Sequence, residues 1–320
     1  MEKIYDVIVV GELNVDLILN QIQGYPEIGK EIIADKMTLA LGSSSAICAS
    51  NLSSLGCKVA FIGKVGNDVF GNYTLGQLQE KGVDTSMVII EDQEETGATI
   101  ALNYNEDRAM VTHLGAMSNL SIDNIDFQNL RLARHLHFSS YFFQSGFKNK
   151  LHVLFMKAKE MGMTTSLDVQ WDPFEAWDLD LDKILPHVDI FIPNEVELLK
   201  LTGSSNIDSA IDSIKNRGRH TVIKCGRKGS ILFYADKRVS CKPFLNKNVV
   251  DAIGAGDSFN AGYISKFIKG KSPEECQRFG NLIGAISTTK PGGTEALKNM
   301  DEAMKLAKNK FNYIDDETTG

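Results

Sequence analysis

Short apolar runs alternate with segments of helical period along almost the whole chain. We predict strands at residues 7–10, 60–62, 135–139, 164–168, 189–192, 221–224 and 230–234. Helices are predicted between them, at residues 43–55, 71–81, 149–161, 194–201, 207–216, 257–268 and 273–287. Because strands that alternate with helices form right-handed βαβ units, this pattern predicts an α/β fold with a largely parallel sheet covered on both faces.

Residues 16–41 and 96–113 break this rhythm. Polar and apolar side chains alternate in both segments without a helical period, as at Thr96, Ala98, Ile100 and Leu102. The segments could pair as a small extra sheet that projects as a lid, or they could form two separate surface hairpins. A lid over a cleft would exclude water, which suits chemistry in which water is a competing reactant.

The composition is that of a globular protein, with 43% hydrophobic and 23% charged residues in a chain of 320 residues. The 34 basic and 41 acidic side chains give a net charge of −7, and no basic stripe offsets it, which argues against a nucleic-acid partner. The five cysteines include no CxxC pair, and no apolar run approaches the roughly 20 residues of a membrane span. We therefore expect a cytoplasmic protein with neither nucleic acid nor a membrane as partner.

The motif with the clearest chemical meaning is DAIGAGDSFNAG at residues 251–262. Gly254, Ala255 and Gly256 form a small-residue turn whose backbone N–H groups can converge on an anion. Asp257 then opens a predicted helix at its positive end, where a carboxylate could accept a proton from a hydroxyl. Phosphoryl transfer needs this pairing of donors and base. The alternative is a tight loop before a carboxylate that only stabilises the helix.

The same motif closely resembles the DTTGAGDxFxAG signature of the ribokinase-like (PfkB) carbohydrate kinases. The resemblance implies one ribokinase-like kinase domain over residues 1–320, a three-layer α/β/α fold with lid segments at about 16–41 and 96–113 inserted in its core. It also implies ATP and Mg²⁺ as cofactors, Asp257 as the catalytic base, and an anion hole made by Gly254, Ala255 and Gly256.

The resemblance extends to a site for a monovalent cation. In ribokinases the segment before the glycines helps to bind an activating cation such as K⁺, which implies a role for Asp251 and Ile253. The loop that contains Thr288 and Gly293 would close the same site. Here Ala252 and Ile253 replace the usual threonine pair. K⁺ dependence therefore stays open, since a main-chain carbonyl could replace the lost hydroxyl.

At the substrate end, GELNVD (residues 11–16) resembles the family's NxD element. The resemblance implies that Asn14 and Asp16 hydrogen-bond sugar hydroxyls, whereas the residues alone allow a polar loop between a strand and the lid. Arg108 and His113 of the second lid segment could meet an acidic or heavily hydroxylated substrate, or they could be solvated lid charges.

The helix start after the first lid segment departs from the family. Gly42 and Ser43 stand at the usual diglycine, so Ser43 replaces the second glycine. Ile47 stands where ribose-type enzymes have asparagine, and Tyr141 lies near the position of their substrate-contacting glutamate. The substrate is therefore expected to differ from ribose, and other sugars, sugar acids and nucleosides stay open.

PNEVELLKLTG (residues 193–203) resembles the family's NxxE motif. This implies that Asn194 and Glu197 organise Mg²⁺ and its waters near the nucleotide phosphates. An asparagine followed three residues later by a glutamate at a helix start is also a capping box, and the two interpretations are compatible.

Two further segments resemble the nucleotide-binding part of the family. KCGRKGS (residues 224–230) is similar to the strand-end turn that contacts ATP, which implies contacts from Lys224, Gly226 and Gly229. Lys224 replaces the common threonine, and its charge could add a phosphate contact. FGNLIGAISTTKPGG (residues 279–293) resembles the helix and loop beside adenine, with Asn281 on the base side.

We therefore predict ATP-dependent phosphorylation of a hydroxyl group on a small sugar-like substrate. A nucleoside kinase of the same fold and a non-catalytic sugar or nucleotide sensor remain as alternatives. A dinucleotide-binding GxGxxG would need glycine at Leu13 and Asp16, and a P-loop at residues 24–31 would need serine or threonine at Glu31, so both patterns fail. A homodimer through the lid is compatible with the resemblance and would cover exposed strand edges.

Overall fold

The computed structural model describes residues 2–104, 107–215 and 217–314. Three of the predicted segments include residues outside these ranges. They are the helix 207–216 at residue 216, the lid segment 96–113 at residues 105–106, and the domain 1–320 at both of its ends. Among the described residues, no helix is both long and apolar enough to cross a bilayer.

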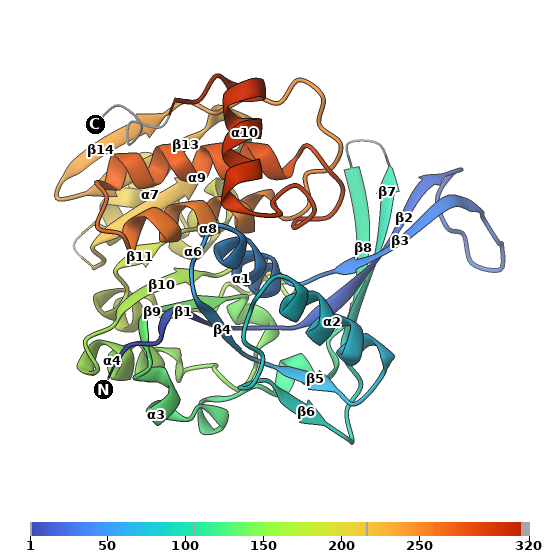
Figure 1. The fold of residues 1–320 in the computed structure, drawn as a ribbon, viewed down its shortest axis with the longest axis horizontal. Coiled ribbons are helices and arrows are strands. Elements are labelled where there is room, and N and C mark those ends of the chain that lie inside the picture. Colours follow the sequence, from blue (N-terminus) through green and yellow to red (C-terminus); the bar gives the residue numbers. More distant parts are fainter. Residues whose placement is uncertain (1, 105–106, 216, 315–320) are drawn as a thin grey trace.

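The central sheet has eight strands in the order β14-β13-β12-β11-β10-β9-β1-β4 (Figure 1). Its strands are β1 (Tyr5–Val10), β4 (Val59–Ile62), β9 (Ala133–Ser139), β10 (Thr164–Asp168), β11 (Ile190–Phe191), β12 (His220–Lys224), β13 (Ser230–Tyr234) and β14 (Lys237–Cys241). Neighbours from β4 to β12 are parallel, and β13 and β14 add antiparallel strands. The predicted largely parallel α/β sheet is confirmed.

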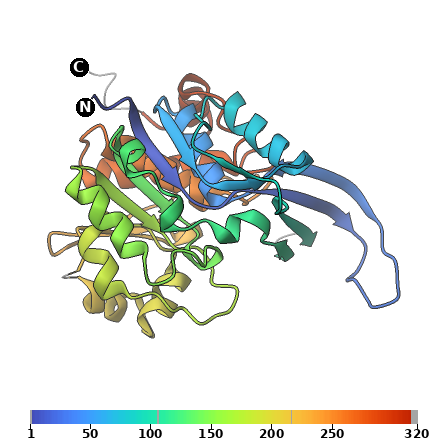
Figure 2. The ribbon, with the colours of Figure 1, turned by 90° about the horizontal axis from the view of Figure 1, so that it is seen from below.

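Helices cover both faces of this sheet and give three layers (Figure 2). One face packs on α1 (Ser44–Ser54), α2 (Val69–Glu80), α8 (Ala255–Phe267), α9 (Pro273–Ser287) and α10 (Met300–Phe311). The other packs on α3 (Phe127–Leu130), α4 (Leu151–Glu160), α5 (Leu181–Ile184), α6 (Glu195–Thr202) and α7 (Ile207–Ile214). Alternating residues of β1 feed both cores: Val7 and Val9 belong to the first, Ile8 and Val10 to the second.

A separate sheet projects from the body in Figures 1 and 2 and forms the lid. Its strands are β2 (Asn14–Ile22), β3 (Ala34–Leu41), β7 (Gly97–Tyr104) and β8 (Asp107–His113), in the order β3-β2-β7-β8. Because β2 and β7 pair in parallel, the two lid segments form one sheet rather than separate hairpins. A two-stranded sheet of β5 (Lys64–Gly66) and β6 (Ile89–Glu91) lies at its base.

The two faces of the lid differ in chemistry. Residues that pair across the strands share a face, and successive residues alternate between faces. Asn14, Asp16 and Thr99 therefore lie on one face. Leu17 and Ile100 lie on the opposite face, which is apolar.

Candidate active site

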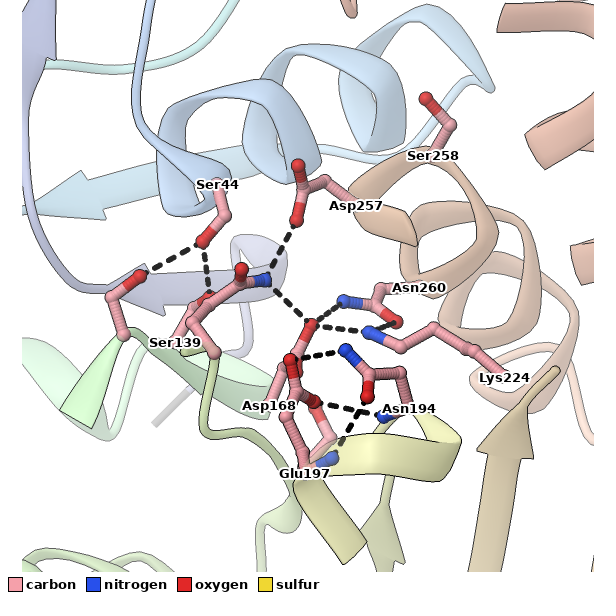
Figure 3. Close-up of polar contacts among 12 residues, drawn as sticks. Ser44, Ser139, Asp168, Asn194, Glu197, Lys224, Asp257, Ser258 and Asn260 are labelled. Carbon is pink, nitrogen blue, oxygen red and sulfur yellow. Dashed lines mark hydrogen bonds and ion pairs between the residues drawn. The ribbon is translucent and has the colours of Figure 1, made fainter. Parts of the chain in front are cut away.

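The candidate site lies at the carboxyl ends of β10 and β12, where three helices begin (Figure 3). Helix α8 begins after Gly254, α6 begins after Asn194, and α1 begins after Ser43. Open α/β sheets bind ligands at this edge. The positive ends of the helices also favour an anion there.

Asp257 lies in the first turn of α8 and is buried. Gly254 precedes the helix with a φ of 72°, and a Cβ there would lie only 2.5 Å from Cα of Gly293. The turn therefore requires glycine at this position. The Ala255 N–H donates to the Ala252 carbonyl at 3.3 Å. The N–H groups of Gly256 and Asp257 belong to the first turn of α8, where N–H groups have no acceptor within the helix, and they lie beside the Asp257 carboxylate.

The environment of Asp257 favours its protonated form. Burial raises the pKa of Asp257 to about 7, and the nearby Asp168 carboxylate adds to the shift. The Lys224 ammonium group opposes it. Asp257 can therefore change protonation state close to neutral pH.

A buried ion pair lies beside Asp257 (Figure 3). Lys224 Nζ is 2.7 Å from Asp168 Oδ2, and Asn260 of α8 donates to the same oxygen. Gln170 Nε2 lies 3.0 Å from Asp168 Oδ2 and 3.0 Å from Asp257 Oδ1. One amide group thus links the ion pair to the candidate base.

Lys224 also reaches the glycine turn. A Cβ on Gly256 would lie 3.6 Å from Lys224 Nζ, so the ammonium group is next to the first turn of α8. Burial alone lowers the pKa of Lys224, but Asp168 and Glu197 raise it above its usual value. An anion held by the α8 amides would therefore also meet a fixed positive charge.

Asn194 and Glu197 form a capping box at the start of α6. Asn194 Oδ1 accepts from the backbone N–H of Glu197 at 2.9 Å, and Glu197 Oε2 accepts from the backbone N–H of Asn194 at 2.8 Å. A β-bridge between Asn194 and Lys224 places this helix start next to the ion pair. Burial and then Asp168 raise the pKa of Glu197 above its usual value. The capping interpretation is confirmed, and the box lies inside the site.

The donors around Lys224 fit a hard divalent cation. Asp168, Glu197 and Asp257 are buried carboxylates that influence one another, and Oδ1 of Asp168 has no hydrogen-bond partner within the described ranges. Oxygen donors with excess negative charge suit Mg²⁺. No group of three His, Cys, Asp or Glu side chains among residues 2–104, 107–215 and 217–314 is arranged to hold a metal directly. Mg²⁺ would thus keep several water or phosphate oxygens as ligands.

The predicted nucleotide contacts gather around the end of β14. Gly226 and Gly229 have φ values of 53° and 90°, and a Cβ on Gly229 would lie 2.1 Å from the Cys241 carbonyl oxygen. Asn281 of α9 donates to the same carbonyl at 3.4 Å. The turn after β12 and the middle of α9 therefore meet at Cys241.

The residues predicted for a monovalent cation lie in two adjoining loops. Asp251 accepts hydrogen bonds from the backbone N–H groups of Ile253 and Gly292, at 2.9 and 3.0 Å. The carbonyl oxygens of Thr288 and Gly293 accept hydrogen bonds from other protein groups. Hydrogen bonds from the Asp251 carboxylate thus connect the loop at residues 251–253 with the loop at residues 288–293.

Asn14 and Asp16 approach the start of α1 from lid strand β2. A Cβ on Gly42 would lie 2.4 Å from Asp16 Oδ1 and 2.7 Å from Asn14 Oδ1, so any larger residue there would displace these two side chains. Asn14 donates to Thr99 Oγ1 at 2.9 Å. Burial raises the pKa of Asp16 to about 6, against the opposing effects of the Asn14 hydrogen bond and the Arg108 charge. The Asn14 amide thus bridges lid strands β2 and β7, and Asp16 lies beside it at the base of the lid next to Gly42.

Hydroxyl groups and one carboxylate line the start of α1. Ser43 has a φ of 68°, and its hydroxyl donates to the Glu12 carbonyl at 2.6 Å while it caps the helix. The buried Glu12 side chain accepts from the backbone N–H of Ser44 at 2.8 Å. Ser44 Oγ also lies 2.9 Å from the hydroxyls of Ser139 and Ser140. The carboxylate of Glu12 thus occupies the positive end of α1.

Ile47 and Tyr141, the two positions that depart from ribose-type enzymes, lie in different parts of the structure. The Ile47 side chain packs against Gly254 and Gly293, beside the glycine turn. Tyr141 belongs to the core on the α4 face, where its hydroxyl meets the backbone of Asn149. The structure does not bring Tyr141 to the site, because Ser140 takes a left-handed conformation with φ of 59° and turns the chain away. Ser139 and Ser140 are the residues of this strand end that meet Ser44.

The loop after β10 carries exposed aromatic rings. Trp171 and Phe174 are exposed, and the Trp171 ring lies 5.1 Å from that of Trp177. Asp172 holds the loop by accepting from the backbone N–H groups of Phe174 and Trp177, at 2.9 and 2.6 Å. This aromatic loop directly follows Gln170.

Asp168, Gln170 and Glu12 were absent from the residues predicted from the sequence. Asp168 ends a predicted strand at the edge of the sheet that binds ligands, and this placement was the available signal. Gln170 and Glu12 carry no such signal, because their roles depend on partners that the fold supplies.

The chain is similar to known proteins in sequence and in fold. A model described as the pfkB family carbohydrate kinase matches residues 5–300. A sugar kinase of Archaeoglobus fulgidus, itself described as uncharacterized, is 32% identical over 250 residues that cover 77% of this chain and 97% of that protein. The ribokinase of Haemophilus influenzae is 28% identical over 305 residues, covering 93% and 97%. The structure of Arabidopsis thaliana ribokinase complexed with ribose and ATP superposes with a TM-score of 0.81 at 25% identity, covering 96% and 99%.

Proposed function

The chain belongs to the pfkB family of carbohydrate kinases, and from this premise we propose that Asp257 is the base of an ATP-dependent sugar kinase. As the sugar oxygen bonds to the γ-phosphorus, the bond to the ADP oxygen breaks and the hydroxyl proton passes to Asp257. The main support for this proposal is the position of Asp257, which is buried in the first turn of α8 beside the Lys224 ammonium group and the backbone N–H groups of that turn.

The transferring phosphoryl group would lie against the Gly254–Gly256 turn. The backbone N–H groups there stabilise charge on its oxygens, and Lys224 adds a fixed positive charge. The Asp168 carboxylate holds Lys224 in place through the 2.7 Å ion pair. Positioning and electrostatics supply most of the rate increase in phosphoryl transfer, so these groups need no covalent role.

ATP and Mg²⁺ would enter from the side of β12 and α6. Lys224, Gly226, Gly229 and Asn281 bind the nucleotide, while Glu197 and Asn194 hold waters of Mg²⁺. When bound there, Mg²⁺ would supply positive charge that offsets the negative charge of the phosphates. For K⁺, the carboxylate of Asp251 and the carbonyl oxygens of Ile253, Thr288 and Gly293 are the proposed ligands. The five cysteines are free, which supports a reducing cytoplasm.

The sugar would lie between the lid and α1. We propose that it is an uncharged sugar rather than a sugar acid. Asn14 and Asp16 bind its hydroxyls, beside Gly42 and Ser43. Glu12, Asp251 and Asp16 carry like charges that influence one another here. Glu12 also occupies the positive end of α1, where a substrate carboxylate would otherwise bind. A neutral polyol can donate hydrogen bonds to these oxygens, whereas a sugar acid would be repelled.

ADP release in a coupled assay tests this assignment. Each sugar, such as ribose or glucose, is assayed beside its aldonic acid, ribonate or gluconate, and the neutral open-chain alcohols ribitol and glucitol control for the loss of the ring. We expect a neutral sugar to have a kcat/KM at least about 100-fold above that of its acid, since placing like charges together costs several kcal/mol. Nucleosides are assayed in parallel, with Mg²⁺ and with or without K⁺.

The Asp257→Asn variant is the blank for this assay. Turnover of a sugar acid in preference to its neutral partner would overturn the neutral assignment and direct attention to Arg108. A nucleoside as the best substrate would favour the nucleoside-kinase alternative. Binding of ATP and sugar without ADP release from any compound would favour the sensor.

For the protein in solution we propose a homodimer through the lid. Its apolar face includes Ile100 and Val111, which pair across β7 and β8 and are 42% and 66% exposed. Leu17 of β2 extends the same row. An exposed apolar sheet face of this kind is covered in most soluble proteins.

Light scattering after gel filtration checks the dimer. Val111→Asp should convert a dimer to a monomer, because it buries a charge in the apolar face. Met110→Asp is the matched control, since the neighbouring residue is 59% exposed and points to the opposite face of β8. A monomeric wild type, or equal effects of the two variants, would exclude this interface.

A further inference from the structure

Gln170 lies two residues after the end of β10 and places its side-chain amide between two carboxylates. The amide nitrogen, Nε2, lies 3.0 Å from Asp168 Oδ2 and 3.0 Å from Asp257 Oδ1. Both contacts are drawn in Figure 3 as dashed lines that end on Asp257 and Asp168. An amide nitrogen carries two hydrogens, so Gln170 can donate one to each carboxylate at the same time.

The backbone of Gln170 has a conformation that is uncommon for this residue type. Its φ is 61°, in the left-handed region, which residues other than glycine seldom adopt. Such conformations cluster at functional sites, where the surrounding contacts hold them. The loop that follows has its own hydrogen-bonding residue, Asp172, which accepts from the backbone N–H groups of Phe174 and Trp177. The contacts of the Gln170 amide are therefore with the site and not with this loop.

The two hydrogen bonds of Gln170 add different things. Oδ2 of Asp168 also accepts from the ammonium group of Lys224 and from the amide of Asn260. Gln170 is a third donor to that oxygen, so Asp168 serves as an anchor for the amide. In the ranges that the structure describes, no group other than the Gln170 amide donates to the Asp257 carboxylate. Loss of the amide would therefore affect Asp257 more than Asp168.

The charges around Asp257 make a neutral donor important there. The ionisable groups that act on Asp257 are Asp168, Lys224, Glu12, Glu197 and Cys48. Three of these groups are carboxylates, which repel an ionised Asp257, and the cation among them is already paired with Asp168. An amide can hydrogen-bond an ionised carboxylate without adding a further charge.

We propose that Gln170 is a positioning residue for Asp257. Its amide, anchored on Asp168, holds Oδ1 of Asp257 and leaves Oδ2 to accept the proton of the substrate hydroxyl. The same amide links the orientation of Asp257 to Lys224, because Gln170 and Lys224 both contact Asp168 Oδ2. The effect on turnover rests on the proposed kinase function, whereas the hydrogen bond to Asp257 does not.

Gln170→Met tests the effect on turnover. Methionine keeps an unbranched side chain of similar length but has no N–H to donate. We expect kcat to fall about tenfold or more, because a poorly oriented base reacts more slowly. KM for ATP and for the sugar should stay within about threefold of the wild type, since neither ligand depends on this amide for binding. Steady-state kinetics measure both quantities.

A double variant shows whether Gln170 acts through Asp257. If it does, adding Gln170→Met to Asp257→Asn should lower the residual kcat by less than about twofold, because the base is already absent. A tenfold loss in both backgrounds would mean that Gln170 acts on another group, and it would overturn the proposal.

Gln277→Met is the matched control. Gln277 is buried in α9, and its Nε2 donates to the carbonyl oxygens of Ser230 and Val239 rather than to a carboxylate. The substitution should lower the melting temperature without lowering kcat. Equal losses of kcat in Gln277→Met and Gln170→Met would reduce the role of Gln170 to general stability and overturn the proposal.

The hydrogen bond itself can be measured without turnover. In ¹H–¹⁵N spectra, sequential assignment identifies the side-chain amide signals of Gln170 and Gln277. We expect the Gln170 signals to shift in Asp257→Asn, where the acceptor changes from a carboxylate to a neutral amide oxygen, and the Gln277 signals to stay in place.

Gln170 signals that are the same in the wild type and in Asp257→Asn would show that the contact is absent, and they would overturn the proposal. If Gln170→Met fails to fold, these spectra decide, because they do not need that variant. If no substrate is phosphorylated, the proposed function fails and the same spectra still decide whether Gln170 holds Asp257.

Discussion

Replacing Asp257 by asparagine is expected to lower kcat by about 10²- to 10⁴-fold, the usual range for removal of a general base. The amide keeps the shape of the side chain and can still meet Gln170, which contacts Asp257 Oδ1. Binding of ATP and of the sugar should therefore change by no more than about threefold. Single-turnover kinetics and calorimetric titration of each ligand measure the two effects separately.

The matched control for this variant is Asp208→Asn. Asp208 also lies in the first turn of a helix, α7, but it is exposed and pairs with Arg238. Its substitution should leave kcat unaltered. If Asp257→Asn keeps more than about a tenth of the wild-type kcat, a factor of only about 1.4 kcal/mol, Asp257 is not the base.

The pH dependence gives an independent check on the same residue. Since the pKa of Asp257 is raised to about 7, the carboxylate is protonated in acid and cannot accept a proton. The kcat/KM of the wild type, which reports the free enzyme, should rise about tenfold per pH unit below 7 and level off above it. The residual activity of Asp257→Asn should lack this rise.

The second large effect is expected for Lys224→Met. The ammonium group is nearly buried and pairs with the fully buried Asp168, so removing it leaves an uncompensated carboxylate. Breaking a buried ion pair in this way costs about 3–5 kcal/mol of unfolding free energy. The variant also loses the positive charge beside the Gly254–Gly256 turn, and kcat should fall by about 10²-fold or more.

Lys228→Met provides the control for Lys224→Met. Lys228 lies four residues further on in the same turn, is exposed and pairs with the Glu195 carboxylate at 3.2 Å, so the unfolding free energy and kcat should hardly change. In the double variant Asp168→Leu with Lys224→Met, much of the stability should return without the activity. Denaturant melts and steady-state kinetics measure both. If the Lys224→Met enzyme stays active, Lys224 does not make the proposed phosphate contact.

The sequence predicted those elements whose apolar pattern follows directly from burial. Strand β13 and helix α9 have the predicted bounds, since each has an apolar pattern with clear breaks at both ends. Strand β10 also has the predicted bounds, although Leu167 is the one apolar residue of its TTSLD sequence. Strand β14 and helix α10 were not predicted. β14 reads KRVSC, an edge strand with little apolar surface. Helix α10 has five charged residues among its twelve and buries mainly Ala303 and Ala307. Edge elements bury few side chains, so their patterns are weak.

The parts of the site that could be predicted from the sequence are those whose functional residues are close together along the chain. The glycine turn and Asp257 stand together in one motif, and the capping box of Asn194 and Glu197 spans four residues. Asp168 could not be assigned from such a pattern, because its partners Lys224 and Asn260 are 56 and 92 residues away. Parallel strands with helical crossovers bring such distant strand ends together, and only the fold shows which ends meet.

Tyr141 is a residue that the sequence placed near the substrate and that the structure places in the core. Its place after β9 suggested a contact with the substrate, yet one left-handed residue, Ser140, turns its ring into the core. A non-glycine residue at positive φ carries little sequence signal. The side chain at a strand end therefore follows from the backbone conformation of the neighbour before it.

The aromatic loop after β10 provides an intrinsic fluorescence signal close to the candidate site. Trp171 and Trp177 are the two tryptophans of the whole sequence, and both lie within seven residues of Gln170, which contacts Asp257. The ultraviolet emission of the protein therefore originates almost entirely beside the candidate base. A ligand that reorders this loop should change the wavelength or intensity of the tryptophan emission. Binding can therefore be followed by intrinsic fluorescence, without an attached dye and without turnover.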